Sequence, residues 1–179
     1  QIIHESRRQL RYLFEDMLEV SYLENLTEPL PRSYLNLCAL CRSQLRAMKI
    51  RCPKTGVAYA DGIPAETIAV VSSEKYLGVL LSALLGNAYK FTREGHIRLE
   101  CGREGDERVY IAVTDTGCGI PPEKYDQAFE RFTKLDPFSQ GNGLGLYLCR
   151  LIVRHLGGEI RIDPEYTEGT RIVVVLPRK

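Results

Sequence analysis

The sequence predicts an α/β protein, in the form of an α+β two-layer sandwich: a mixed β-sheet carries helices on one face, and one further helix precedes it. Three observations lead to this fold class. Four segments place apolar residues at helical spacing, two pairs of segments alternate polar and apolar residues as strands do, and short Gly- or Pro-containing stretches separate them. No internal repeat or low-complexity segment interrupts this order.

Size and composition are those of one globular domain with an appended element. The chain has 179 residues, of which 44% are hydrophobic and 26% charged. Its 24 basic and 23 acidic residues give a net charge of +1, so we expect no nucleic-acid partner. No apolar run has bilayer length, and we expect no direct membrane contact from this chain. Because it starts at Gln1 without a methionine, we expect an excised fragment whose parent need not be soluble.

The first segment, residues 3–23, has the spacing of a helix with two apolar rows. Each row repeats every seven residues: Ile3, Leu10 and Met17 form one, and Leu13 and Val20 form the other. This heptad-like pattern fits the end of a longer helical hairpin that pairs with another chain, and equally a single amphipathic helix packed on its own domain. Two prolines between Asn25 and Pro31 are expected to end the helix and form a hinge.

The next segments lead from a second helix to a third. Residues 33–48 have apolar positions at helical spacing, with Ser33 placed as the N-cap. Residues 49–73 contain short β-prone pieces punctuated by Pro and Gly, of which Ile68–Val71 is the best strand candidate. Residues 74–91 carry a continuous apolar stripe and predict a strong helix.

Two pairs of strands complete the expected sheet. His96–Cys101 and Arg108–Thr114 alternate about a Gly-containing turn and predict a β-hairpin. Glu159–Ile162 and Thr170–Leu176 predict a second pair around another glycine turn. Between the two pairs, apolar residues recur every three to four positions from Leu146 to Leu156 and predict a helix with a buried face.

Two glycine clusters bracket a polar, charged segment. The first is Asp115-Thr-Gly-Cys-Gly-Ile120, and the second contains Gly141, Gly143 and Gly145 and opens onto the last predicted helix. Glycine lets a ligand approach the backbone closely, and free N–H groups at a helix start attract phosphate. The spacing fits neither the Walker loop nor the Rossmann fingerprint. We therefore expect a nucleotide site of a third kind, with the bracketed segment as a mobile flap.

Polar residues near the end of the third helix point to the same site. Asn87 and Lys90 are three residues apart and so share one helix face. An amide oxygen suits a hard cation such as Mg²⁺, and an ammonium group suits phosphate oxygens. Asp115 ends a predicted strand, where its carboxylate could accept a hydrogen bond from the exocyclic amine of adenine. Each residue alone also fits an ordinary helix-end cap or turn aspartate, so the joint order carries the prediction.

These motifs resemble those of the ATP-binding catalytic domain of sensor histidine kinases. That domain belongs to a superfamily that also includes gyrase B, heat-shock chaperone and mismatch-repair ATPases. The similar segments are residues 84–92 (asparagine box), 115–120 (first glycine box), 129–132 (phenylalanine box), 141–146 (second glycine box) and Gly169-Thr170. Residues 3–24 resemble the second helix of the dimerisation and phosphotransfer hairpin. The resemblance implies a Bergerat-type ATP-binding fold over residues 27–179, with residues 1–26 as the hairpin's last helix.

The resemblance assigns roles in nucleotide binding. It implies that Asn87 coordinates Mg²⁺, that Lys90 contacts phosphate, and that Asp115 and Thr170 hold adenine. The residues that it implies shape the pocket and its lid are Gly117, Gly119, Ile120, Gly141, Gly143, Leu144 and Gly145.

Arg131 and Lys134 are the candidates for reaching the γ-phosphate from the lid, and with Lys90 they form the expected catalytic set. Their task would be to place the γ-phosphoryl in line with a histidine and to neutralise developing charge. The sequence departs from the family at Ala83, where an earlier asparagine is usual. That departure puts the affinity for metal in question.

The resemblance implies the kinase domain of a two-component sensor, in the cytosolic portion of a membrane-bound protein. Such a domain transfers the ATP γ-phosphoryl to a histidine, from which a response regulator receiver domain takes it, and the hairpin implies a homodimer of the full-length protein. His4-Glu5 with Arg7 imitates the histidine box, but the expected proline is absent, so we expect the acceptor outside this chain. Two alternatives stay open: a non-catalytic interaction module of the same fold, and an ATPase that drives a conformational cycle.

Six cysteines show no disulfide framework, which predicts reduced thiols in a cytosolic setting. Cys38 and Cys41 form a CxxC without a second ligand pair, so a zinc site is a minor alternative. Cys118 lies within the first glycine box. It could line a nucleotide pocket or be an inert buried thiol.

Overall fold

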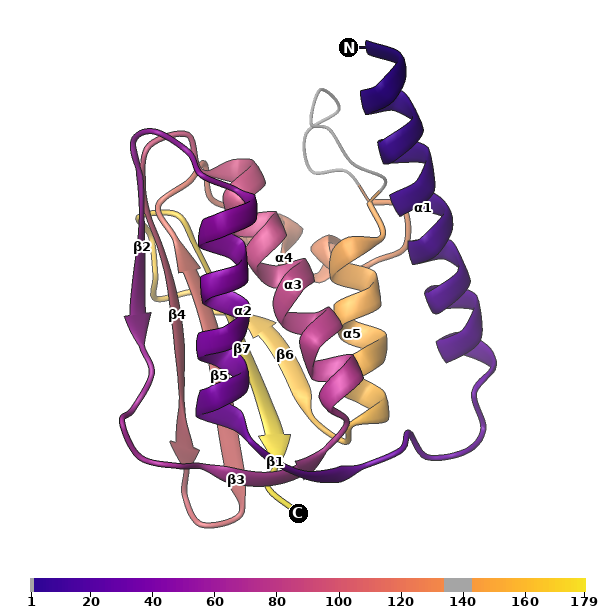
Figure 1. Ribbon diagram of the computed structural model, residues 1–179, viewed down its shortest axis with the longest axis vertical. Helices are drawn as coiled ribbons and strands as arrows, with labels where there is room; N and C mark the ends of the chain where they lie inside the picture. Colours follow the sequence, from indigo (N-terminus) through magenta and orange to yellow (C-terminus); the bar gives the residue numbers. More distant parts are fainter. Residues whose placement is uncertain (1, 134–142) are drawn as a thin grey trace.

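The computed structural model describes residues 2–133 and 143–179. Within these residues, five strands form a sheet in the order β2-β4-β5-β7-β6 (Figure 1). Their bounds are Val57–Gly62 (β2), Gly95–Glu104 (β4), Arg108–Asp115 (β5), Glu159–Ile162 (β6) and Thr170–Pro177 (β7). Strand β2 runs parallel to β4 and every other neighbouring pair is antiparallel, so the predicted mixed sheet is confirmed.

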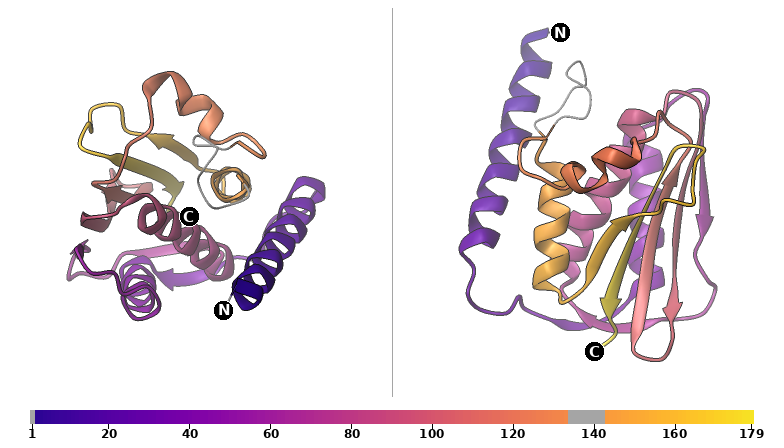
Figure 2. Two further views of the ribbon diagram at one scale, coloured as in Figure 1. Left: turned by 90° about the horizontal axis from the view of Figure 1, so that it is seen from above. Right: turned by 180° about the vertical axis from the view of Figure 1, so that it is seen from behind.

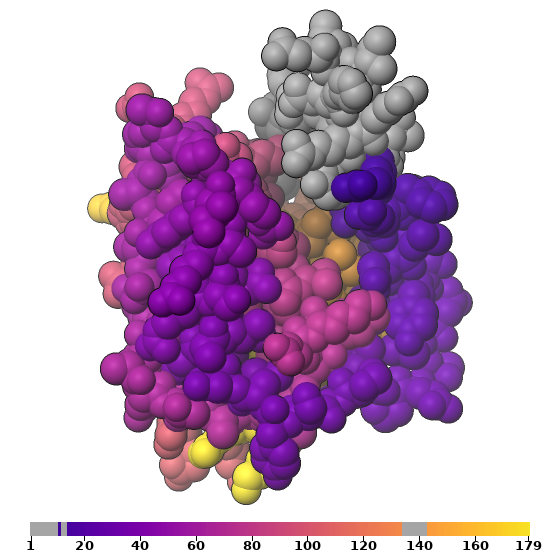
Figure 3. Space-filling model, viewed as in Figure 1, coloured from indigo at the N-terminus to yellow at the C-terminus, as the bar shows by residue number. Residues whose placement is uncertain are grey.

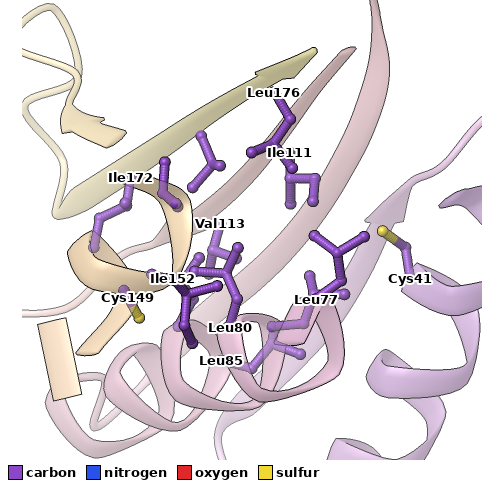
Figure 4. Packing of buried hydrophobic residues seen from close by; sticks show 14 of the residues in the cluster. Cys41, Leu77, Leu80, Leu85, Ile111, Val113, Cys149, Ile152, Ile172 and Leu176 are labelled. Carbon is purple, nitrogen blue, oxygen red and sulfur yellow. The ribbon is translucent and has the colours of Figure 1, made fainter. Parts of the chain in front are cut away.

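Three helices cover one face of this sheet, which confirms the predicted two-layer sandwich (Figures 1 and 2). They are α2 (Leu37–Arg51), α3 (Glu74–Phe91) and α5 (Gly145–His155). Apolar residues from these helices meet those of β5 and β7 in one buried core (Figure 4). The alternation predicted for β5 holds, because Ile111 and Val113 face this core while Ala112 joins a smaller cluster with Val173 and Val175.

The region before α3 differs from the prediction. Ser33–Asn36 is not the first turn of a helix but a strand, β1, that pairs antiparallel with β3 (Ala69–Ser72). The N-cap of α2 is therefore Asn36, whose side chain accepts a hydrogen bond of 3.3 Å from the Ala39 N–H, and the predicted cap at Ser33 is wrong. A four-residue strand that pairs with a distant segment shows little periodicity of its own. The helical spacing of residues 37–48 therefore fits Ser33–Asn36 as well, although these four residues form a strand.

The N-terminal helix α1 (Ile2–Asn25) stands beside α5 and leads through an extended segment into β1 (Figure 1). Its described apolar residues divide between two faces. Val20 and Leu23 are fully buried in the domain core, whereas Phe14, Leu18 and Tyr22 are more than half exposed. The end of the helix therefore packs on its own domain, while a ridge at four-residue spacing remains open to another partner. No helix within the described ranges has the length and apolarity needed to cross a membrane.

Short elements connect the sheet to the second glycine cluster. After β5 the chain forms a 3₁₀ turn, Pro122–Lys124, and the one-turn helix α4, Tyr125–Ala128. Phe129 of the predicted phenylalanine box is buried, while Phe132 is 54% exposed and has a left-handed φ of 60°. Such a φ is unfavourable for a bulky residue and marks a sharp change of direction there.

Candidate functional site

The candidate site lies at the end of the sheet where β5 stops and β7 begins. Asp115 and Thr170 are cross-strand partners in the antiparallel register of these strands. Partners of this kind place their side chains on the same face of a sheet. Both residues are buried, at 5% and 7% exposure. The two residues predicted to hold adenine are therefore polar groups in an otherwise apolar interior.

Hydrogen bonds hold the buried Asp115 carboxyl in place. Its Oδ1 accepts a hydrogen bond of 2.8 Å from the Gly117 N–H. Burial raises the pKa of Asp115 above its ordinary value of 3.8, and the nearby N–H groups of Gly117 and Thr170 and the Thr92 side chain oppose that rise. The carboxyl is thus desolvated yet fixed in orientation, as a group that recognises a ligand's hydrogen-bond donor must be.

The end of α3 supplies the second part of the site. Asn87 is half-buried and Lys90 is exposed, with its ammonium group 4.6 Å from the centre of the Phe91 ring. Their spacing of three places both on one helix face, as predicted. Thr92, the C-cap residue, is fully buried and its hydroxyl donates a 2.7 Å hydrogen bond to the Ala88 carbonyl.

Lys54 supports this helix end, a role that the sequence does not predict. Its ammonium group donates hydrogen bonds to the carbonyl oxygens of Thr92 (2.6 Å) and Tyr89 (3.3 Å), and it lies 4.9 Å from the Tyr89 ring centre. A cation at the carboxyl end of a helix satisfies orphan carbonyls and complements the helix dipole. A lysine in a loop so far along the chain from the helix gives no sequence signal for this role.

Glycines allow the first glycine box to pass close to other backbone. A β-carbon on Gly117 would lie 2.5 Å from the Phe91 carbonyl oxygen, closer than any side chain could approach. Gly119 has a φ of 71° and lies against the backbone of Gly169. Ile120, which ends the box, is half-buried and packs against the core. The box is therefore a turn wedged between α3 and the start of β7.

The second glycine box opens the helix α5. Gly143 has a φ of 70° and would clash with Phe132 and Thr133 if it carried a β-carbon. Leu144, the N-cap residue of α5, is fully buried. A β-carbon on Gly145, the first helical residue, would meet nothing within 4 Å, which leaves open space at the start of α5. Lys134 and Gly141 fall outside the described residues.

Arg131 is engaged by the N-terminal helix. Its Nη1 lies 3.4 Å from a carboxylate oxygen of Glu24, and the same Glu24 accepts a hydrogen bond of 2.6 Å from the Tyr147 hydroxyl. The guanidinium also stands over the Phe132 ring at 5.0 Å. No sequence pattern singles out Glu24 or Tyr147, because only the tertiary fold brings residues 24, 131 and 147 together.

The cysteine predictions have mixed outcomes. Cys118 is exposed, so the interpretation as a buried thiol is wrong. Cys38 and Cys41 are fully buried, and Cys101 of β4 brings its sulfur to 3.8 Å from that of Cys38. Across the described part of the chain, no group of three or more His, Cys, Asp or Glu side chains is arranged to hold a metal ion.

A cavity of about 800 Å³ lies between α1, α2 and α3, and Figure 3 shows the corresponding hollow beside α1. Its lining includes Gln44 of α2, Leu148 of α5, and Ser82 and Ala83 of α3. Ala83, the departure noted in the sequence, is half-buried one helical turn before Asn87. No carboxamide from residue 83 is therefore present to join Asn87 as an oxygen ligand.

Together these residues place a hydrogen-bonding carboxyl, an amide and cationic groups around one end of the fold. A family model described as "Histidine kinase-, DNA gyrase B-, and HSP90-like ATPase" matches residues 72–179, which contain Asn87, Lys90, Asp115, Arg131 and Thr170.

Named relatives resemble the chain over nearly its whole length or over about half of it. The adaptive-response sensory kinase SasA of Gloeothece citriformis is 32% identical over 99% of this chain and 47% of its own length. The sensor protein SrrB of Staphylococcus aureus is 36% identical over 55% of this chain and 18% of its own length. Full-length ShkA, solved in complex with AMPPNP, superposes with a TM-score of 0.83 at 28% identity over 97% of this chain and 36% of ShkA. The chain thus spans about half of the length of SasA and about a fifth of that of SrrB.

Proposed function

The chain belongs to the family of histidine kinase-, DNA gyrase B- and HSP90-like ATPases, and from this premise we propose that it binds ATP as the kinase domain of a sensor histidine kinase. In this proposal it transfers the γ-phosphoryl to a histidine outside the chain, from which a response regulator receiver domain accepts it. The observation that carries the proposal is the buried pair Asp115 and Thr170, next to the α3 end that bears Asn87 and Lys90.

The Asp115 carboxylate is proposed to accept a hydrogen bond from the exocyclic amine of adenine, with the Thr170 hydroxyl beside it. Guanine carries a carbonyl at the corresponding position and would face the carboxylate with another acceptor, so the pair favours ATP over GTP. The burial of Asp115 supports this role, because a hydrogen bond in a desolvated site discriminates more strongly than one in water.

The phosphates are proposed to extend from this pair toward the end of α3 and the start of α5. Lys90 and Arg131 supply positive charge, with Lys134 as a further candidate, and the open space at Gly145 admits a phosphate to the N–H groups of α5. The Asn87 amide oxygen fits as one ligand of a Mg²⁺ ion that would otherwise be coordinated by phosphates and water. When bound, Mg²⁺ would reduce the negative charge of the phosphates. Gly117, Gly119, Ile120, Gly141, Gly143 and Leu144 are proposed to shape the pocket by their backbone.

Residues 1–26 are proposed to be the last helix of a dimerisation and phosphotransfer hairpin, and residues 27–179 the ATP-binding domain. The extended segment that follows Asn25 supports this boundary. The exposed ridge of Phe14, Leu18 and Tyr22 supports a helical partner for α1, from the other helix of such a hairpin or from a second subunit.

Calorimetric titration of ATP and ADP, with and without Mg²⁺, tests the proposal. Asp115→Asn keeps the shape of the side chain but replaces one acceptor with a donor, so affinity for ATP should fall by about ten- to a hundredfold. Asp61→Asn, on the exposed edge strand β2, is the matched control and should bind as the unmodified chain does. A folded chain that binds no nucleotide would instead favour the non-catalytic interaction module. If binding is found, phosphotransfer is tested in a chain that carries a complete dimerisation and phosphotransfer hairpin.

A further inference from the structure

One carboxylate of the N-terminal helix contacts two residues, one before and one after the second glycine box in the sequence. Glu24, in the last turn of α1, pairs with Arg131 and accepts the hydrogen bond of Tyr147, which lies in the first turn of α5. The segments that carry Arg131 and Tyr147 meet at Gly143, which is in close contact with Phe132 and Thr133. Glu24 therefore ties α1 to both segments at the place where they come together.

The contact is specific but open to competition. The side chain of Arg131 is 42% exposed and that of Glu24 is 28% exposed, so neither charge would be stranded in the interior if the pair separated. Both Glu24 oxygens lie 3.4 Å from the same Arg131 nitrogen. The hydrogen bond to Glu24 raises the pKa of the Tyr147 phenol, in keeping with a charged acceptor. Arg131 thus has its charge matched before any nucleotide arrives.

We propose that Glu24 competes with the terminal phosphate of ATP for Arg131, so that the docked position of α1 weakens the binding of ATP. The inference rests on the proposed function, in which Arg131 approaches the γ-phosphate. A phosphate brought to this guanidinium would also approach the Glu24 carboxylate, and repulsion between the two anions favours release of one of them. By linkage, ATP that engages Arg131 loosens the contact between α1 and the domain to the same extent.

A second glutamate of α1, Glu19, provides a matched control. Glu19 also pairs with one cation and one tyrosine: its Oε1 lies 3.0 Å from the Lys75 ammonium group, and its Oε2 accepts a hydrogen bond of 3.3 Å from the Tyr76 hydroxyl. Its side chain is 31% exposed, close to that of Glu24. Loss of Glu19 removes a comparable link between α1 and the domain without freeing Arg131. It therefore separates release of Arg131 from a general loosening of α1.

The test is a titration of ATP, ADP and AMP, each with Mg²⁺, into the 179-residue chain and its variants Glu24→Gln, Glu19→Gln, Arg131→Gln and Glu24→Gln with Arg131→Gln. Glu24→Gln should tighten ATP binding by about two- to fivefold, as expected for a partly exposed ion pair, and leave AMP binding unchanged. Glu19→Gln should change neither. In the Arg131→Gln background, the substitution at Glu24 should no longer affect ATP. Thermal unfolding of each variant by circular dichroism verifies that it is folded.

The outcomes separate this inference from the proposed function. If the chain binds ATP and Asp115→Asn weakens that binding as expected, but Glu24→Gln leaves ATP affinity unchanged or lowers it, the competition is disproved and the proposed function stands. An equal gain in ATP affinity with Glu19→Gln would likewise disprove the competition, because the docking of α1 in general would then be what weakens ATP binding. If the unmodified chain binds no nucleotide, both fail together.

Discussion

Asp115 lies directly opposite Thr170 in the register of β5 and β7, and both residues are buried. The two residues thereby close the end of the sheet with a buried polar contact. Their neighbours are held equally closely, because Gly169 packs directly against the Asp115 carbonyl and Gly117 packs against both Phe91 and the Asp115 side chain.

The stability of the chain should depend on pH through Asp115. Burial raises the pKa of this carboxyl in the folded state above 3.8, so its protonation favours folding below pH 3.8, and that contribution is lost as the pH rises through the raised pKa. Asp115→Asn cannot titrate. The melting temperature of Asp115→Asn relative to the unmodified chain should therefore rise across this window and then level off, measured by circular dichroism. A difference that is flat from about pH 3.5 to 8 would contradict the predicted shift.

A methyl group at residue 169 should be poorly tolerated. A β-carbon there would overlap the Asp115 carbonyl and the Thr116 backbone, so Gly169→Ala should lower the free energy of unfolding by about 3 kcal/mol, measured by urea denaturation. The control is Gly86→Ala in α3, where a β-carbon would meet nothing within 4 Å. That change should instead stabilise the helix by roughly 0.5–1 kcal/mol. Equal effects at both positions would show that the close approach at Gly169 is not as described.

Removing the Lys54 cap should weaken the end of α3. Lys54→Met keeps much of the stem but loses both hydrogen bonds to the helix carbonyls, so we expect a loss of about 1–2 kcal/mol in the free energy of unfolding. Lys49→Met, at an exposed position in the last turn of α2, serves as the control and should stay within about 0.5 kcal/mol of the unmodified chain. If both substitutions lower the free energy of unfolding by the same amount, the Lys54 cap contributes little to stability.

Thiol reactivity should follow burial. Cys118 is exposed and should react first with iodoacetamide, whereas Cys149 is fully buried and burial raises the pKa of its thiol to about 12. Peptide mass spectrometry of the native chain should find Cys118 labelled well before Cys149, with both labelled in urea. The Cys118→Ser variant controls for the assignment. Saturating ADP should slow the reaction of Cys118 if that residue borders the nucleotide, and an unchanged rate would place it outside the pocket.

Local patterns predicted most of the elements. The apolar stripe of residues 74–91 predicted α3 with the bounds that the structure has, and the alternation in residues 96–114 predicted the β4–β5 hairpin. These patterns succeed because a helix or strand buried on one face must repeat its apolar residues at its own period. The predicted strand Ile68–Val71 corresponds to β3, but β1 and β2 had no such signal. Each is short, and its partner is distant in sequence.

The sequence by itself determined which residue types could build a nucleotide site, because Asn87, Lys90, Asp115 and the glycines stand in an order that ordinary helix caps and turns do not require. It could not determine the surroundings of those residues. Lys54 at the end of α3 and Glu24 on Arg131 depend on contacts across 38 and 107 residues of chain. Only the tertiary structure decided these pairings, since charged side chains on separate segments carry no shared period and meet only when the core beneath them has packed.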